Sequence, residues 1–182
     1  MRLFVDSLSG RLPRRCRLKI NPNPPMQAIT PFLWFNNEAE RAVHFYTSIF
    51  PKSKILATSY YTEGSPGKPG SVMTIKFRIL DQEFIALNGG PVFKFNESVS
   101  FVVNCHNQRE VDNYWRKLSA GGKKVQCGWL KDKFGVSWQV VPTALTELIA
   151  SDDEEKNERV MNAMLKMVKL DIKTLQRAAA GK

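Results

Sequence analysis

The sequence predicts an α+β fold of two strand–helix–strand units followed by a helical C-terminal segment. Three observations carry this prediction. A buried-strand pattern leading into a capped helix occurs twice, with the caps Asn37 and Asn107 lying 70 residues apart. A hairpin pattern runs from Asp132 to Pro142, and helical periodicity returns after Ser151. The repeated order of elements indicates an internal duplication.

The first unit opens with an apolar run at residues 29–35, which predicts a buried strand. Asn37, with Glu40 three positions later, has the pattern of a helix cap. Apolar residues then recur at helical spacing until Pro51: Ala39, Ala42, Val43, Tyr46, Ile49 and Phe50. We expect a helix with one buried face.

Three further strands are predicted in the first unit, at residues 55–61, 72–80 and 83–87. A glycine-rich and proline-rich segment at 64–70 separates the first two strands, and Asp81-Gln82 separates the last two. The unit is therefore expected to be βαβββ.

The second unit repeats this order with one recognisable strand fewer. Residues 99–103 predict a strand, and Asn107 with Glu110 repeats the cap. A buried helix stripe follows: Val111, Tyr114, Trp115 and Leu118. Strands are expected at 124–129 and 136–141, joined by an Asp-x-x-Gly turn in which Gly135 supplies backbone freedom.

The C-terminal segment is expected to be helical. Ser151 and Glu154 form a capping-box pattern, and Asp171 is a candidate start of a separate final helix. An apolar stripe follows the cap: Met161, Met164, Leu165, Val168, Ile172 and Leu175. We expect this stripe to cover the sheet; an adaptable ligand-contacting or dimer surface is the alternative.

These patterns divide the chain into three parts. Residues 1–26 form a basic extension that contains prolines, residues 27–150 form one domain of two units, and residues 151–180 form an amphipathic helical segment. Two interpretations of the extension remain open. It is either disordered or mis-started, with Met26 as the functional start, or it is a targeting segment or arm.

Composition excludes several functional classes. The net charge of +10 is partly local to the basic extension, and no basic aromatic strand or recognition helix is evident, so nucleic-acid binding is not expected. No apolar run reaches the ~20 residues that would span a bilayer. Three cysteines and two histidines at long spacing predict neither a disulfide framework nor a zinc site. A cytoplasmic protein with no membrane partner is expected.

Two motifs identify a family resemblance. The first is Pro31-Phe-Leu-Trp-Phe-Asn-Asn-Glu-Ala-Glu with His44-Phe-Tyr-Thr, and the second is Gly-Trp-Leu-Lys-Asp132-x-Phe-Gly-Val-Ser-Trp-Gln-Val-Val-Pro. Together they resemble the PhnB-like group of the vicinal oxygen chelate superfamily over residues 27–148. The group is also named 3-demethylubiquinone-9 3-methyltransferase, and its relatives include glyoxalase I, bleomycin-resistance proteins and ring-cleaving dioxygenases. The resemblance implies curled mixed sheets of two βαβββ units and a homodimer.

Active relatives hold a divalent metal through four inward-facing strand positions. The resemblance aligns Pro31, Ala86, Ser100 and Gln139 with these positions. None is a histidine or carboxylate, which catalytic zinc and hard cations require, so neither a metal nor another cofactor is expected. Methyl transfer is not expected either, because Gly89-Gly90 follows a predicted strand but opens no helix.

The remaining candidate is the cup that a curled sheet encloses. We expect its ligand-binding side chains to be Phe35, Phe84, Asn88, Ser100, Trp129 and Gln139. Such a mostly apolar cup suits a small organic ligand, although the same side chains could simply fill a core. No catalytic residue is assigned, and whether the protein is an enzyme is left open.

The sequence leaves three hypotheses about function. The leading hypothesis is a metal-independent PhnB-like protein that binds a small molecule. The first alternative is a metal-dependent lyase, isomerase or dioxygenase-type enzyme of the same superfamily, and the second is an interaction protein that uses its Met-rich tail. Cys127 is either a reactive thiol or a buried strand residue.

Overall fold

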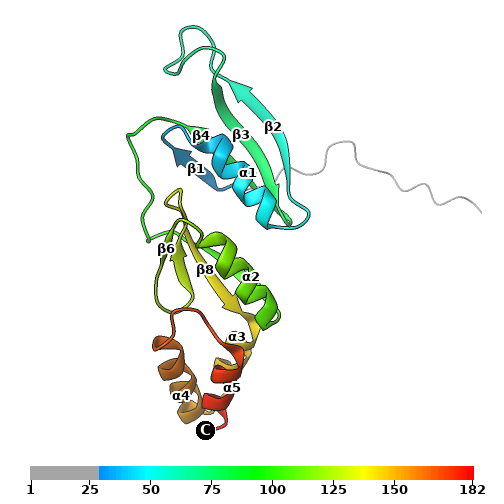
Figure 1. Cartoon of the computed structure of the whole chain (residues 1–182), viewed down its shortest axis with the longest axis vertical. Coiled ribbons are helices and arrows are strands. Elements are labelled where there is room, and N and C mark those ends of the chain that lie inside the picture. The colour runs from blue at the N-terminus through cyan, green and yellow to red at the C-terminus, as the bar shows by residue number, and fades with distance from the viewer. Residues whose placement is uncertain (1–28) are drawn as a thin grey trace, which may run out of the picture.

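The structure is a computed structural model that describes residues 29–182 (Figure 1). The predicted N-terminal extension lies outside the described residues. The first unit contains β1 (Phe32–Phe35), α1 (Ala39–Ile49), β2 (Lys54–Tyr60), β3 (Val72–Ile79) and β4 (Gln82–Asn88). The second unit contains β5 (Phe101–Cys105), α2 (Gln108–Leu118), β6 (Lys123–Lys124), β7 (Trp129–Lys131) and β8 (Ser137–Pro142).

The two units share one topology, as the internal duplication predicted. Their sheets have the strand orders β1-β4-β3-β2 and β5-β8-β7-β6. In each sheet the first strand pairs in parallel with the last, and the other pairs are antiparallel. The second unit has one strand more than the sequence pattern predicted. Cys127 and Gly128 take positive φ angles and divide the predicted 124–129 strand into β6 and β7. The α+β class and the two βαβββ units are confirmed.

Each sheet has one face buried by a helix and one open face. In the first sheet Phe77 is fully buried, and its ring stacks on Tyr46 of α1 at a centroid distance of 6.3 Å. In the second sheet Val103 and Val140 are buried on the same side as Trp115 of α2. Because strand side chains alternate, the residues between these positions lie on the open faces.

A buried polar cluster joins the two units. The Asp132 side chain, in the turn between β7 and β8, accepts hydrogen bonds from Tyr46 Oη of α1 at 2.8 Å and from Trp138 Nε1 at 2.9 Å. It also accepts from the backbone N–H groups of Phe134 and Val136. Asp132 is therefore a turn-stabilising residue, and its second oxygen bridges the two units.

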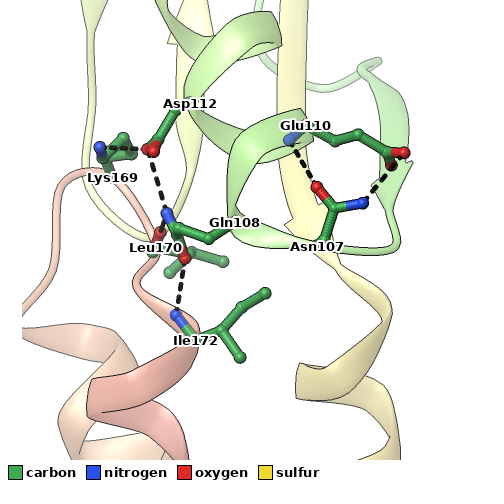
Figure 2. A network of polar contacts seen from close by, with 7 residues as sticks. All are labelled: Asn107, Gln108, Glu110, Asp112, Lys169, Leu170 and Ile172. Atoms are coloured by element: carbon green, nitrogen blue, oxygen red, sulfur yellow. Dashed lines mark hydrogen bonds and ion pairs between the residues drawn. The ribbon is translucent and has the colours of Figure 1, made fainter.

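The predicted caps have different outcomes. Asn107 caps α2 as expected, because its Oδ1 accepts from Glu110 N at 3.0 Å (Figure 2). Asn37 does not cap α1, so that prediction is wrong. The first N–H group of α1, on Ala39, instead donates to Asn88 Oδ1 of β4 at 2.9 Å. A distant strand residue has replaced the local cap.

Three helices follow the second unit: α3 (Thr143–Ile149), α4 (Glu154–Leu165) and α5 (Ile172–Ala179). The sequence did not predict α3. Asp153 rather than Ser151 caps α4, and Asp171 caps α5 as the separate helix that was anticipated. No helix within residues 29–182 has the length and apolar character needed to cross a membrane.

The expectation that the tail covers the sheet is wrong. The helices build a small core of their own, from Leu145, Val160, Leu170 and Leu175, beyond the end of β8 (Figure 1). Of the predicted stripe, Leu165 and Val168 remain about half exposed. Breaking the helix at Lys166 rotates the later positions away from the line that one continuous helix would give.

A clamp formed by Gln108 holds this tail against α2 (Figure 2). Gln108 Nε2 donates to the carbonyl of Leu170 at 3.2 Å, and Gln108 Oε1 accepts from the N–H group of Ile172 at 2.9 Å. Lys169 pairs with Asp112, which also accepts from Gln108. The oxygen and the nitrogen of the Gln108 amide therefore both hydrogen-bond to the backbone at the start of α5.

Candidate functional site

Three of the expected site residues lie together on the open face of the second sheet. Gln139 Nε2 of β8 donates to Ser100 Oγ, which precedes β5, at 2.9 Å. Trp129 of β7 and Val102 of β5 are the ladder partners of Gln139 and share its face. Val102 is 51% exposed. This face thus combines an amide, a hydroxyl, an indole and an aliphatic side chain.

Two other expected residues, Phe35 of β1 and Phe84 of β4, lie on the helix-covered face of the first sheet. Phe35 and Phe84 are 3% and 5% exposed and belong to the core between sheet and helix. The Phe84 ring stacks on Phe77, which itself contacts α1. The open-face orientation that we expected for both is wrong. The alternation was right, but its phase was off by one residue, which moves every side chain of a strand to the other face.

The Asn88 side chain forms hydrogen bonds that hold the first unit together. Besides capping α1, its Nδ2 donates to Glu40 Oε2 at 2.7 Å and to the carbonyl of Val72 at 3.0 Å. Both ends of the amide are therefore bonded within the fold. The structure places Asn88 away from the group formed by Ser100, Trp129 and Gln139.

The same shift of phase changes two of the four positions that the resemblance aligned with metal ligands. Ala86 is fully buried on the helix-covered face, and Pro31 precedes Leu33 and Phe35 on that side by alternation. The ladders give the true equivalents. Val102 pairs with Gln139 as Phe32 pairs with Ile85, so Ile85 corresponds to Gln139 and Thr30 to Ser100.

The corrected set, Thr30, Ile85, Ser100 and Gln139, does not fit a catalytic metal. It offers two hydroxyls, one amide and one hydrocarbon, whereas zinc and the hard cations take imidazole, thiolate or carboxylate ligands. Within residues 29–182, no group of three or more histidine, cysteine, aspartate or glutamate side chains is placed to hold a metal ion.

A charged cluster on the open face of the first sheet was missed. Glu83 of β4 pairs with Lys76 at 2.8 Å and with Arg78 at 2.5 Å, both on β3. Hydrogen bonds from Lys76 and Arg78 lower the pKa of Glu83. The spacing of Lys76 and Arg78, two residues apart in a strand, was the signal that could have found this cluster.

The two thiols within residues 29–182 differ in their surroundings. Cys105 is fully buried under α2, and burial raises the pKa of its thiol to about 12. Cys127 lies partly exposed in the turn between β6 and β7, where its N–H group donates to the carbonyl of Met167 at 2.8 Å. Its backbone therefore helps to dock the tail, and the prediction of a reactive Cys127 thiol stays untested.

Comparison with known proteins identifies the family. Residues 27–141 match the profile described as 3-demethylubiquinone-9 3-methyltransferase. The PhnB protein from Bacillus cereus is 38% identical, over 64% of this chain and 99% of its own, with a TM-score of 0.59. A protein from Pseudomonas aeruginosa is 20% identical, over 64% and 98%, with a TM-score of 0.54, and shows likeness of fold alone.

A more remote match is the fosfomycin resistance protein FosX from Listeria monocytogenes, described as complexed with Mn(II) and sulfate. It is 15% identical over 62% of this chain and 88% of its own, and the TM-score of 0.43 carries no argument about this chain. None of the curated proteins compared with the chain matches it. The profile spans well over half of the chain and both βαβββ units, so the protein belongs to the 3-demethylubiquinone-9 3-methyltransferase family, the PhnB-like group that its motifs predicted.

Proposed function

We propose that this protein binds a small organic ligand against the open face of the second sheet and does so without a metal ion. The observation that carries the proposal is the hydrogen-bonded pair of Ser100 and Gln139 beside Trp129 and the half-exposed Val102. A few polar groups set in an apolar surface are typical of small-molecule sites. Side chains that only filled a core would be covered, and Val102 is not.

We also propose that two copies form a homodimer, as the resemblance implied. Both open faces carry exposed apolar side chains, Phe32 at 54% in the first unit and Val102 at 51% in the second. A second copy laid over these faces would remove them from water and complete the cup. Among the described residues of a single copy, nothing covers the half of Val102 that stays exposed.

We do not assign methyl transfer from the family's name. Of the described glycine-rich segments, Gly89-Gly90 leads from β4 into the connection to β5, and residues 64–70 join two strands of a hairpin. Neither opens a helix, so neither offers the strand–glycine–helix turn of the common S-adenosylmethionine site.

Native mass spectrometry of protein purified from its own host without added metal tests the proposal. A dimer that carries an organic adduct and no stoichiometric metal is the expected result. Gln139→Ala should lose the adduct, whereas the matched control Gln176→Ala, at an exposed position of α5, should retain it. One firmly held divalent ion per subunit would overturn the metal-independent function and favour the alternative, a metal-dependent enzyme.

A further inference from the structure

A pocket lies beside Ser137, which shares the open face of β8 with Gln139. The connection between β4 and β5 crosses the start of the second sheet and encloses a pocket of about 430 Å³, here named the linker pocket. Its apolar walls include Phe32, Phe95 and Phe101. Its polar side chains are Lys94, Asn96, Ser98 and Ser137.

The linker pocket contains a buried hydroxyl with no partner. Ser137 of β8 is 2% exposed, and its Oγ has no hydrogen-bond partner among the described residues. Ser137 lies two residues before Gln139 on the same strand, so both side chains point to the same side of the sheet. A buried hydroxyl without a partner costs free energy, and a bound acceptor would remove that cost.

The other polar groups of the pocket also favour an acceptor. Asn96 Oδ1 already accepts from the N–H group and the hydroxyl of Ser98, which leaves the Asn96 amide nitrogen to donate. Lys94 brings a positive charge, and no aspartate or glutamate lines the pocket. The nearby carboxylate of Glu97 is paired with Lys131. Donors and a cation around aromatic walls are complementary to an anion on an apolar body.

We propose that the linker pocket binds the carboxylate of a small aromatic or aliphatic acid, with Ser137 Oγ as a hydrogen-bond donor and Lys94 as the counter-charge. The inference rests on the proposed function, because Ser137 of the linker pocket lies on the same face of β8 as Gln139. A pocket of this volume accommodates one ring and a short side chain.

Three probes with the same carbon skeleton separate charge from apolar contact: 3-phenylpropanoate, 3-phenylpropan-1-ol and 3-phenylpropylamine. Titration calorimetry on the full chain should give the tightest binding for the acid. Ser137→Ala should weaken acid binding by about tenfold, because a hydrogen bond to a charged acceptor is lost. Lys94→Met should weaken it by about two- to fivefold, since Lys94 is exposed and its charge is screened.

Ser119→Ala removes another buried serine hydroxyl, and Lys173→Met removes an exposed lysine on α5, and both should leave acid binding unchanged. Equal affinity for acid and alcohol, or acid binding unaffected by Ser137→Ala, would overturn the inference. If the alcohol binds and Gln139→Ala abolishes that binding, the proposed function stands while the ligand class fails. Absence of binding for all three probes would count against both.

Discussion

Asp132 is the residue whose loss we expect to damage this fold most. Its buried carboxylate, 4% exposed, accepts four hydrogen bonds, two from the turn and two from side chains in different units. Asp132→Ala leaves all four donors without an acceptor in the interior. Each unsatisfied donor costs about 1–3 kcal/mol, and the costs do not simply add because the turn can relax. We expect a loss of about 3–5 kcal/mol in the free energy of unfolding.

Tyr46→Phe isolates the bond between the units. It removes only the Tyr46 hydroxyl, which leaves the carboxylate with three donors and should cost about 1.5–3 kcal/mol. Urea unfolding followed by tryptophan fluorescence measures both variants. In the double variant the Tyr46→Phe cost should largely vanish, because its partner is already gone. The exposed control Asp152→Asn should stay within about 0.5 kcal/mol of the wild type.

A loss below about 1 kcal/mol for Asp132→Ala would refute this reasoning, because a carboxylate that bridges two units cannot then be a main determinant of their packing. Full additivity of Asp132→Ala and Tyr46→Phe would refute the bond itself.

The same carboxylate has a pH signature. Burial raises the pKa of Asp132, and the four hydrogen bonds oppose that rise. Because the native state then binds the proton more tightly than the unfolded chain, this contribution to stability is full below the ordinary carboxyl pKa and is lost as pH rises through the folded pKa. The wild type should therefore gain stability relative to Asp132→Asn on acidification through that window. A flat or opposite difference in urea titrations at several pH values would contradict the assignment.

Three further predictions concern single positions. Asn88→Ala should lower the free energy of unfolding by about 1–2 kcal/mol, since it removes the cap of α1, and Asn37→Ala should change little by the same urea assay. Leu80→Gly should stabilise the chain by about 0.5–1 kcal/mol, because Leu80 has a φ of 52° in the turn between β3 and β4; a lower thermal midpoint would contradict this. Cys105 should resist alkylation in the folded protein at neutral pH, given a thiol pKa of about 12, and mass spectrometry of peptides should find it modified only after unfolding.

The sequence pattern correctly predicted the features that depend on hydrogen bonds between residues close together in the chain. Asn107 and Glu110 predicted the start of α2 correctly, because an N-cap bonds to the backbone three residues ahead. The Asp132 turn was recognisable for the same reason, as Asp132 binds the amides of Phe134 and Val136. The repeat of these signals then predicted the duplicated topology.

Contacts between residues far apart in the chain could not be predicted from the sequence pattern. Asn37 had the right type for a cap, but Asn88 from β4 takes that place, and only strand pairing brings it there. The faces of β1 and β4 were assigned with the wrong phase, because both strands are apolar on both sides and alternation alone gives two equal choices. In the structure Phe77 of β3 stacks on Tyr46 of α1, and its ladder partner Phe84 of β4 lies on the same helix-covered face.

The sequence alone determined the class of the fold, the family and a set of candidate ligand residues, because these depend on periodicity, caps and short motifs. Of the candidate residues, Ser100, Trp129 and Gln139 lie together in the second sheet, and their role in ligand binding stays a prediction. Only the tertiary structure decided which faces are open and which carboxylate joins the units. It also showed that the Ser137 hydroxyl, beside the connection from β4 to β5, is buried without a hydrogen-bond partner among residues 29–182. These features arise from contacts between residues far apart in the chain, whose geometry is fixed by packing and not by local propensity.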